Sequence, residues 1–153
     1  MLFRSLITHC CLMVFMLGVL AFFHIAPCIH WLQWFYYTGA LFLLLVGIAF
    51  ISSSLSIFIP DTNSLIGIGI NIGFWATPVF WSPNMVPEQW RWLLHLNPVF
   101  YCVQGLRETF LFHRWFWERQ LFEHALFWTW TLGTLLLGLL IFKKLRPYFA
   151  DEL

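Results

Sequence analysis

Charge is almost absent from the first part of the chain. Between Arg4 and Asp61 there is no Lys, Arg, Asp or Glu, and most of the residues there are Leu, Phe, Ile, Val and Trp. Of all 153 residues only 10% are charged and 61% are hydrophobic, against about 25% and about 45–50% in soluble domains. A water-soluble domain of this size could not bury so much apolar surface. The sequence therefore predicts an all-α integral membrane protein.

Other absences exclude whole classes of function. The chain has no basic run of the kind that binds nucleic acid, and no serine in an elbow motif. Its Gly67-x-Gly69 sequence lies inside an apolar run without the Lys and Ser/Thr of a nucleotide-binding loop. The acidic residues avoid the centres of the apolar stretches, which argues against a proton relay. We expect no enzyme activity, no cofactor on this chain and no nucleic-acid partner.

Cysteine and histidine are too few and too scattered to suggest a disulfide framework or a metal centre. Cys10 and Cys11 are adjacent in an apolar run, where cysteine behaves as a small hydrophobic residue. His24, Cys28 and His30 lie close together in sequence, but their spacing matches no common zinc pattern. We expect no metal site.

Four apolar stretches approach the roughly 20 residues needed to cross a bilayer. They cover residues 5–26, 34–58, 64–82 and 124–142. The third is rich in glycine, which permits close helix packing, and Thr77-Pro78 near its end should kink it. Four crossings place both termini on one side. Basic residues are divided four against four between the two sides, so charge alone does not decide the orientation.

Between the third and fourth crossings, the sequence predicts two short helices. The first covers 88–96 and should end at Asn97, because a residue before proline is disfavoured in the α conformation. Asn97 can then cap a second helix, with Pro98 at its first position and the remainder over 99–112.

Neither short helix can span a bilayer. Both mix aromatic and charged residues, and Gln104, Arg107 and Glu108 share one face of the second by their spacing. A re-entrant hairpin over 86–112 fits this pattern if protein or a wet cavity surrounds it. An amphipathic segment lying flat on the membrane surface fits equally well.

Aromatic side chains bracket this broken region. Their flat apolar faces and polar edges suit sugar rings or lipid head groups, although an anchoring belt at the membrane interface has the same composition. Arg107 could face a phosphate or an acidic sugar, or it could pair with Glu108 or Glu88.

Several ordered motifs resemble the C-terminal part of an ABC-2 type permease. They are Phe74-Trp75-Ala76-Thr77-Pro78, Val86-Pro87-Glu88, Leu96-Asn97-Pro98 and Arg107-Glu108. The closest group is the polysaccharide and polyol-phosphate exporters, which carry capsule, O-antigen or teichoic acid. The resemblance covers about residues 35–153 and includes the basic and aromatic ending. The family usually has Arg-Asp where this chain has Pro60-Asp61.

The resemblance implies an architecture that composition does not show. Permeases of this family have six spanning helices, with two short re-entrant helices on the external side before the last. They form dimers and work with two separate cytoplasmic ATPase subunits, which bind the ATP. Here residues 86–112 would be the re-entrant external gate and 143–153 a cytoplasmic tail, with both termini cytoplasmic. The N-terminal third of the family domain is missing, so we expect a fragment, a split subunit or a truncated product.

The sequence thus predicts the permease component of an ATP-driven exporter of a polysaccharide or lipid-linked glycan in the cytoplasmic (inner) membrane. An ABC-2 exporter of drugs or lipids, or a truncated subunit that does not transport, are the alternatives. Its expected partners are an ATPase subunit, a second copy of the permease, membrane lipid and the glycan. The residues predicted to face the transport path are Trp75, Phe80, Trp81, Tyr101 and Arg107. The predicted helix breaks of the gate are Thr77, Pro78, Asn97 and Pro98.

Overall fold

The computed structural model describes residues 2–25, 28–59 and 61–146, and within these ranges the chain forms helices and no strand. The α-helices of this part are α1 (Leu2–Phe22), α2 (Gln33–Leu55), α3 (Thr62–Ala76), α4 (Trp92–His95), α5 (Pro98–Leu111) and α6 (Leu121–Leu145). Short 3-10 turns lie at Ile29–Leu32, Pro83–Met85, Glu88–Trp90 and Phe116–Glu118. The prediction of an all-α chain is confirmed for these residues. The predicted tail 143–153 lies outside them from residue 147 onward.

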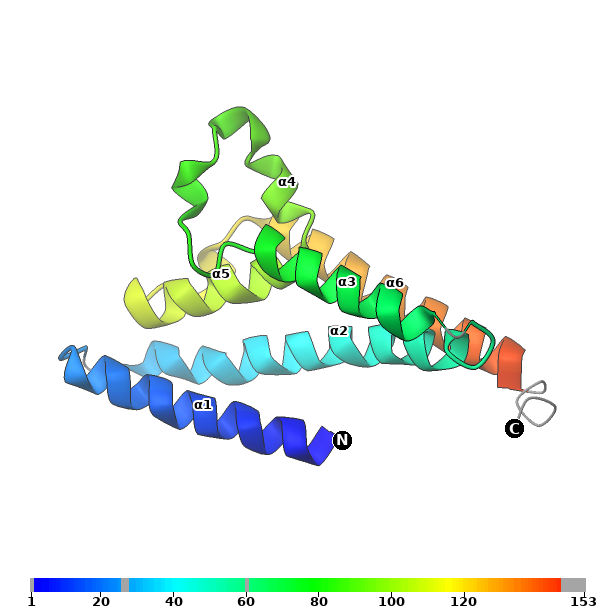
Figure 1. The fold of residues 1–153 in the computed structure, drawn as a ribbon. Helices are drawn as coiled ribbons and strands as arrows, with labels where there is room; N and C mark the ends of the chain where they lie inside the picture. Colours follow the sequence, from blue (N-terminus) through cyan, green and yellow to red (C-terminus); the bar gives the residue numbers. More distant parts are fainter. Residues whose placement is uncertain (1, 26–27, 60, 147–153) are drawn as a thin grey trace.

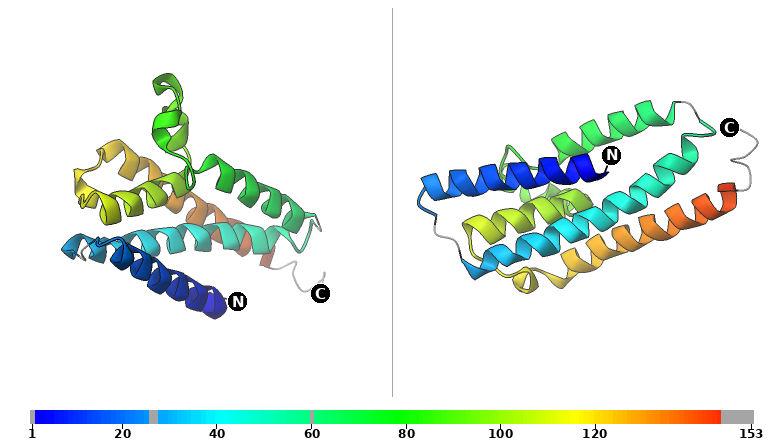
Figure 2. Two further views of the ribbon diagram at one scale, coloured as in Figure 1. Left: turned by 60° about the vertical axis from the view of Figure 1, so that its left-hand side comes forward. Right: turned by 90° about the horizontal axis from the view of Figure 1, so that it is seen from below.

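Helices α2 and α6 form the long axis of the molecule. They lie side by side and run in the same direction, while α1 and α3 run in the opposite direction (Figures 1 and 2). Two stretches of the described residues, Ile29–Leu55 and Leu121–Leu145, are long and apolar enough to cross a membrane. The apolar helical stretches Cys10–Phe22 and Ser64–Ala76 are shorter. The four-crossing arrangement stays a prediction.

Glycine brings α2 and α6 close together. A Cβ atom on Gly138 would lie 2.8 Å from Phe50 Cβ and 2.9 Å from the Gly47 carbonyl oxygen, and one on Gly47 would lie 2.7 Å from Thr134 Oγ1. Close glycine packing therefore occurs on α2 and α6. It does not involve the glycines of α3, where an added Cβ would meet nothing within 4 Å: Gly67, Gly69 and Gly73.

Helix α5 packs against both α2 and α6 and completes the core. The buried residues at this junction are Tyr37, Ala40, Leu44, Tyr101, Cys102 and Phe127. Gly105 of α5 lies directly against the ring of Tyr37, so that any side chain there would overlap the ring. The core of the described chain is thus a three-helix junction that fixes the position of α5.

The predicted third crossing, 64–82, is wrong in its C-terminal bound. Helix α3 ends at Ala76, and Thr77 has an extended backbone (φ −88°, ψ 129°). This is the conformation that a following proline imposes. The Thr77-Pro78 sequence therefore ends the helix, which fits the predicted helix break at these residues and not a kink within a continuous helix.

The predicted helix 88–96 is also wrong in its extent. The structure has a 3-10 turn at Glu88–Trp90 and a single α-turn at Trp92–His95. Backbone bonds here join residues three apart, as from Arg91 to the Glu88 carbonyl (3.2 Å). A segment of about ten residues between two prolines is too short to offset the cost of helix nucleation by itself.

The second short helix begins as predicted. Asn97 is extended (φ −83°, ψ 113°), its side-chain oxygen accepts a hydrogen bond from the Val99 amide at 3.0 Å, and Pro98 occupies the first helical turn. The N-cap prediction is confirmed. Residues 77–97 between α3 and α5 project away from the axis of the long helices (Figure 1).

Candidate functional site

The two helix breaks meet in one place, although they are 20 residues apart in sequence. The Thr77 hydroxyl donates a hydrogen bond to the Gly73 carbonyl at 2.7 Å, and Asn97 Nδ2 donates to the same hydroxyl at 2.8 Å. Both Thr77 and Pro78 are fully buried. We call this cluster, together with Arg107, the break joint: Gly73, Thr77, Pro78, Asn97 and Arg107.

Arg107 reaches the break joint from the third turn of α5. Its Nη2 donates to the carbonyls of Pro78 at 2.7 Å and Val79 at 3.3 Å, and its Nη1 donates to Gln104 Oε1 at 3.3 Å. Carbonyls just beyond a helix end lack an intrahelical donor, and the guanidinium supplies one.

The carboxylates considered as partners of Arg107 are bound elsewhere. Glu88 pairs with Arg91 at 3.6 Å, and Glu108 accepts a hydrogen bond from Gln104 at 2.9 Å. The shared face of Gln104, Arg107 and Glu108 that the spacing predicted is confirmed by these contacts. The guanidinium of Arg107 therefore binds the carbonyls just beyond the end of α3.

Three of the predicted path residues lie next to the break joint. Trp75 is 68% exposed and Phe80 is 81% exposed, and both rings contact Phe74 with centroids 5.7 Å apart. Trp81 is half-buried. The structure thus brings Trp75 and Phe80 together around Phe74 at the surface. That they face a transport path stays a prediction.

Tyr101 lies elsewhere. Only 4% of it is exposed, and its ring stacks on Phe127 of α6 at 4.6 Å. Its hydroxyl lies 3.1 Å from the Tyr36 hydroxyl and 2.7 Å from His124 Nδ1. The sequence grouped Tyr101 with the aromatic residues that bracket the broken region, but the packing of α5 against α2 and α6 turns it into the core. It is therefore not available to a substrate in this conformation.

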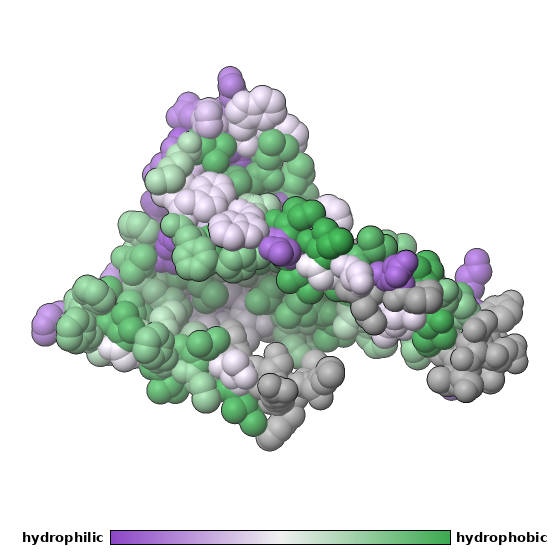
Figure 3. Space-filling view, in the orientation of Figure 1, coloured by the Kyte–Doolittle hydropathy of each residue, from purple (hydrophilic) through white to green (hydrophobic). Residues whose placement is uncertain are grey.

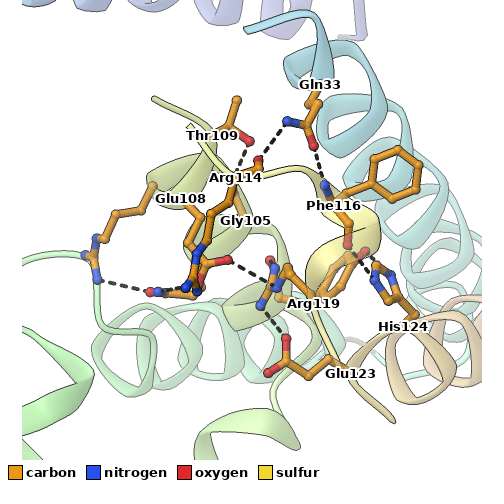
Figure 4. Close-up of polar contacts among 12 residues, drawn as sticks. Gln33, Gly105, Glu108, Thr109, Arg114, Phe116, Arg119, Glu123 and His124 are labelled. Atoms are coloured by element: carbon orange, nitrogen blue, oxygen red, sulfur yellow. Dashed lines mark hydrogen bonds and ion pairs between the residues drawn. The ribbon is translucent and has the colours of Figure 1, made fainter. Parts of the chain in front are cut away.

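A second polar cluster was not anticipated from the sequence (Figure 4). It lies where the chain passes from α5 to α6, and its centre is Arg119, whose side chain is only 5% exposed. Gln33 of α2 joins the same connection, donating to the Arg114 carbonyl at 2.9 Å and accepting from the Phe116 amide. The available sequence signal was the i,i+4 spacing of Arg119 and Glu123.

Of the histidine and cysteine residues near residue 28, His30 packs against other rings. The ring of His30 lies 4.5 Å from that of Trp115 and 6.0 Å from that of His113. Among the residues that the structure describes, no three His, Cys, Asp or Glu side chains lie close enough to hold a metal ion.

The surface of the molecule is strongly apolar. Figure 3 shows hydrophobic residues over the long helices, with the more polar residues gathered on the projecting segment between α3 and α5. Large apolar side chains are exposed on every long helix, for example Phe15, Leu45, Ile70 and Leu140. Helices that satisfy their own backbone groups and expose apolar side chains are those of a membrane-embedded protein.

Comparison with known proteins identifies the class more closely. Residues 1–111 match the family model of the ABC-2 type transporter, and the chain belongs to this family. Two similar relatives are both named O-antigen export system permease protein RfbA, from Klebsiella pneumoniae. They are 30% and 32% identical over 107 residues, which is 70% of this chain. The matched part spans 40% of the length of each relative.

Proposed function

We propose that this chain is a permease component for ATP-driven export of a polysaccharide or lipid-linked glycan. The observation that carries the proposal is the convergence of both helix breaks beside exposed aromatic rings, in a chain similar to permeases named for O-antigen export. ATP would be bound and hydrolysed by a separate ATPase subunit. A second copy of the permease would complete the path.

In this proposal α1, α2, α3 and α6 cross the cytoplasmic membrane and both termini are cytoplasmic. The directions of the helices support the arrangement, since α3 and α5 point the same way and α6 returns (Figure 1). Helix α3 has 15 residues and α5 has 14, about 22 Å and 21 Å at 1.5 Å per residue. Each is shorter than the hydrocarbon core of about 30 Å, so in this proposal the residues after Ala76 complete the crossing of α3, and α4 and α5 form the re-entrant pair.

The transport path would pass the aromatic residues that border the break joint. Trp75, Phe80 and Trp81 present ring faces to sugars, which bind aromatic faces through their C–H surfaces. Arg107 forms part of the wall by binding the Pro78 and Val79 carbonyls just after α3. The irregular backbone at Thr77-Pro78 and Asn97-Pro98 suits a gate, because unpaired backbone at membrane depth requires protein or a wet cavity around it.

Surface glycan in cells that depend on this chain tests the proposal. A ring–ring contact is worth about 0.5–1.5 kcal/mol beyond burial, so we expect Trp75→Ala and Phe80→Ala each to lower export roughly two- to tenfold. Trp130→Ala is the matched control, because Trp130 is a 46% exposed tryptophan on α6 away from the break joint.

The result that would refute the proposal is normal surface glycan in both variants at normal expression. Loss of the whole chain separates the alternatives. Glycan trapped inside the cell supports glycan export, a trapped drug or lipid indicates another ABC-2 cargo, and unchanged transport indicates a subunit that does not transport.

A further inference from the structure

The side chain of Arg119 is the centre of a buried ionic cluster. Its Nη2 lies 2.6 Å from Glu123 Oε2 and its Nε lies 3.6 Å from Glu108 Oε2. Its Nη1 donates to the Tyr101 carbonyl at 2.8 Å, and its Cζ lies 4.7 Å from the centroid of the Tyr101 ring. Arg119 lies outside the residues matched by the family model, which are 1–111.

These contacts join α5, α6 and α4. Tyr101 and Glu108 belong to α5, and Glu123 belongs to α6. Glu123 Oε1 also lies 3.3 Å from His95 Nδ1, at the end of the projecting segment. One guanidinium therefore ties the re-entrant helix α5 to the spanning helix α6, and through Glu123 to α4.

A directed chain of hydrogen bonds continues from the cluster to α2. His124 Nε2 lies 2.8 Å from the Phe116 carbonyl, which can only accept, so Nε2 carries the proton. In the neutral ring Nδ1 then accepts from the Tyr101 hydroxyl, which in turn accepts from Tyr36. The orientation of Tyr101 is thus fixed from both of its ends.

The cluster has the properties of a structural junction and not of a ligand site. Burial by itself would lower the pKa of Arg119, but the carboxylates of Glu123 and Glu108 outweigh it and raise the pKa, which keeps the guanidinium charged. The adjoining pocket has a volume of about 10 Å³, about one water-sized site. A sugar or phosphate does not fit there.

We propose that Arg119 is a positioning residue, which sets the place of α5 and therefore of the break joint against α2 and α6. A planar guanidinium can bond in several fixed directions at once, whereas an ammonium acts as a point charge. The geometry of the bonds, and not only the charge of Arg119, thus determines where α5 lies. The inference rests on the proposed function only for its effect on export.

The reactivity of Cys102 reports the position of α5 without reference to transport. Cys102 lies on α5 in the core and is 1% exposed. The full chain is kept in membranes of the cells that use it, with Cys10, Cys11 and Cys28 changed to Ser so that Cys102 is the remaining thiol. The measurement is the rate at which a maleimide modifies Cys102.

Arg119→Gln removes the guanidinium from two half-buried carboxylates, so we expect labelling to become about tenfold faster or more. Arg119→Gln combined with Glu123→Gln removes most of the charge imbalance. If Arg119 only neutralises charge, the double variant returns to the parental rate. If Arg119 positions α5, labelling stays fast. Arg119→Lys keeps the charge and is likewise expected to label faster.

Arg114→Gln is the control. Arg114 lies in the same connection and is exposed, and its backbone atoms make its hydrogen bonds to Gln33 and Glu108. In the Arg114→Gln variant, Cys102 should be labelled at the parental rate and export should be normal. Parental labelling in Arg119→Lys or in the double variant would overturn the inference, even if export fell. Fast labelling with unchanged export would instead count against the proposed function.

Discussion

At the scale of the residue, Asn97 has three structural roles. Its position before Pro98 ends the turn Trp92–His95, its oxygen caps α5, and its amide nitrogen binds the Thr77 hydroxyl. Asparagine suits this position because its side chain carries both an acceptor and a donor. One residue therefore begins α5 and also binds it to the end of α3.

The first prediction concerns this bond. Asn97→Ala removes the cap and the bond to Thr77, and should lower the free energy of unfolding by about 1–3 kcal/mol. Thr77→Val removes the same bond from the other side. A double-mutant cycle, measured by reversible unfolding in mixed micelles, should give a coupling of at least about 0.5 kcal/mol. Ser82→Ala, which removes an exposed cap at 3.4 Å, should change stability by less than about 0.5 kcal/mol. Additive effects would show that the breaks are independent.

At the scale of the element, the sequence predicted helices well where hydropathy alone decides. The expected stretches 34–58 and 124–142 correspond to α2 (Gln33–Leu55) and α6 (Leu121–Leu145). The sequence failed at 88–96, where it predicted one helix and the structure has two short turns. The conformation of so short a segment between prolines depends on contacts from elsewhere in the fold. Composition shows where glycine permits close packing but not which glycines meet a neighbour, and in this chain Gly47 and Gly138 do.

The glycine contacts between α2 and α6 give the second prediction. Gly138→Ala would force its Cβ to 2.9 Å from the backbone oxygen of Gly47, which the two helices relieve only by moving apart. Overpacking of this kind costs about 1–3 kcal/mol. Gly133→Ala on the same helix meets nothing within 4 Å and should gain up to about 1 kcal/mol from helix propensity. Unfolding in mixed micelles measures both, and equal stability of the two variants would refute the close contact.

At the scale of the whole molecule, the candidate site was only partly predictable. The motifs around Thr77-Pro78 and Asn97-Pro98 could be found because proline and asparagine act on their immediate neighbours. That these motifs touch each other, and that Tyr101 turns inward, follows from how α5 lies between α2 and α6. Arg119 was missed for the same reason. Its side chain binds Tyr101 and Glu108 of α5 and Glu123 of α6, and only Glu123 lies close to it in sequence.

The last prediction tests how the chain is oriented across the membrane. Residues 116–118 and Lys143 lie near opposite ends of α6, and Trp117 and Lys143 are both exposed. In a background with all four native cysteines changed to Ser, a membrane-impermeant maleimide added to intact cells should label Trp117→Cys and leave Lys143→Cys unlabelled. Opening the membrane should allow both to react, because the reagent then also reaches the cytoplasmic side. Phe23→Cys, beyond the end of α1, should react like Trp117→Cys, because α1 and α6 run in opposite directions. Labelling of Trp117→Cys and Lys143→Cys from the same side would mean that α6 does not cross, and the permease proposal would fail with it.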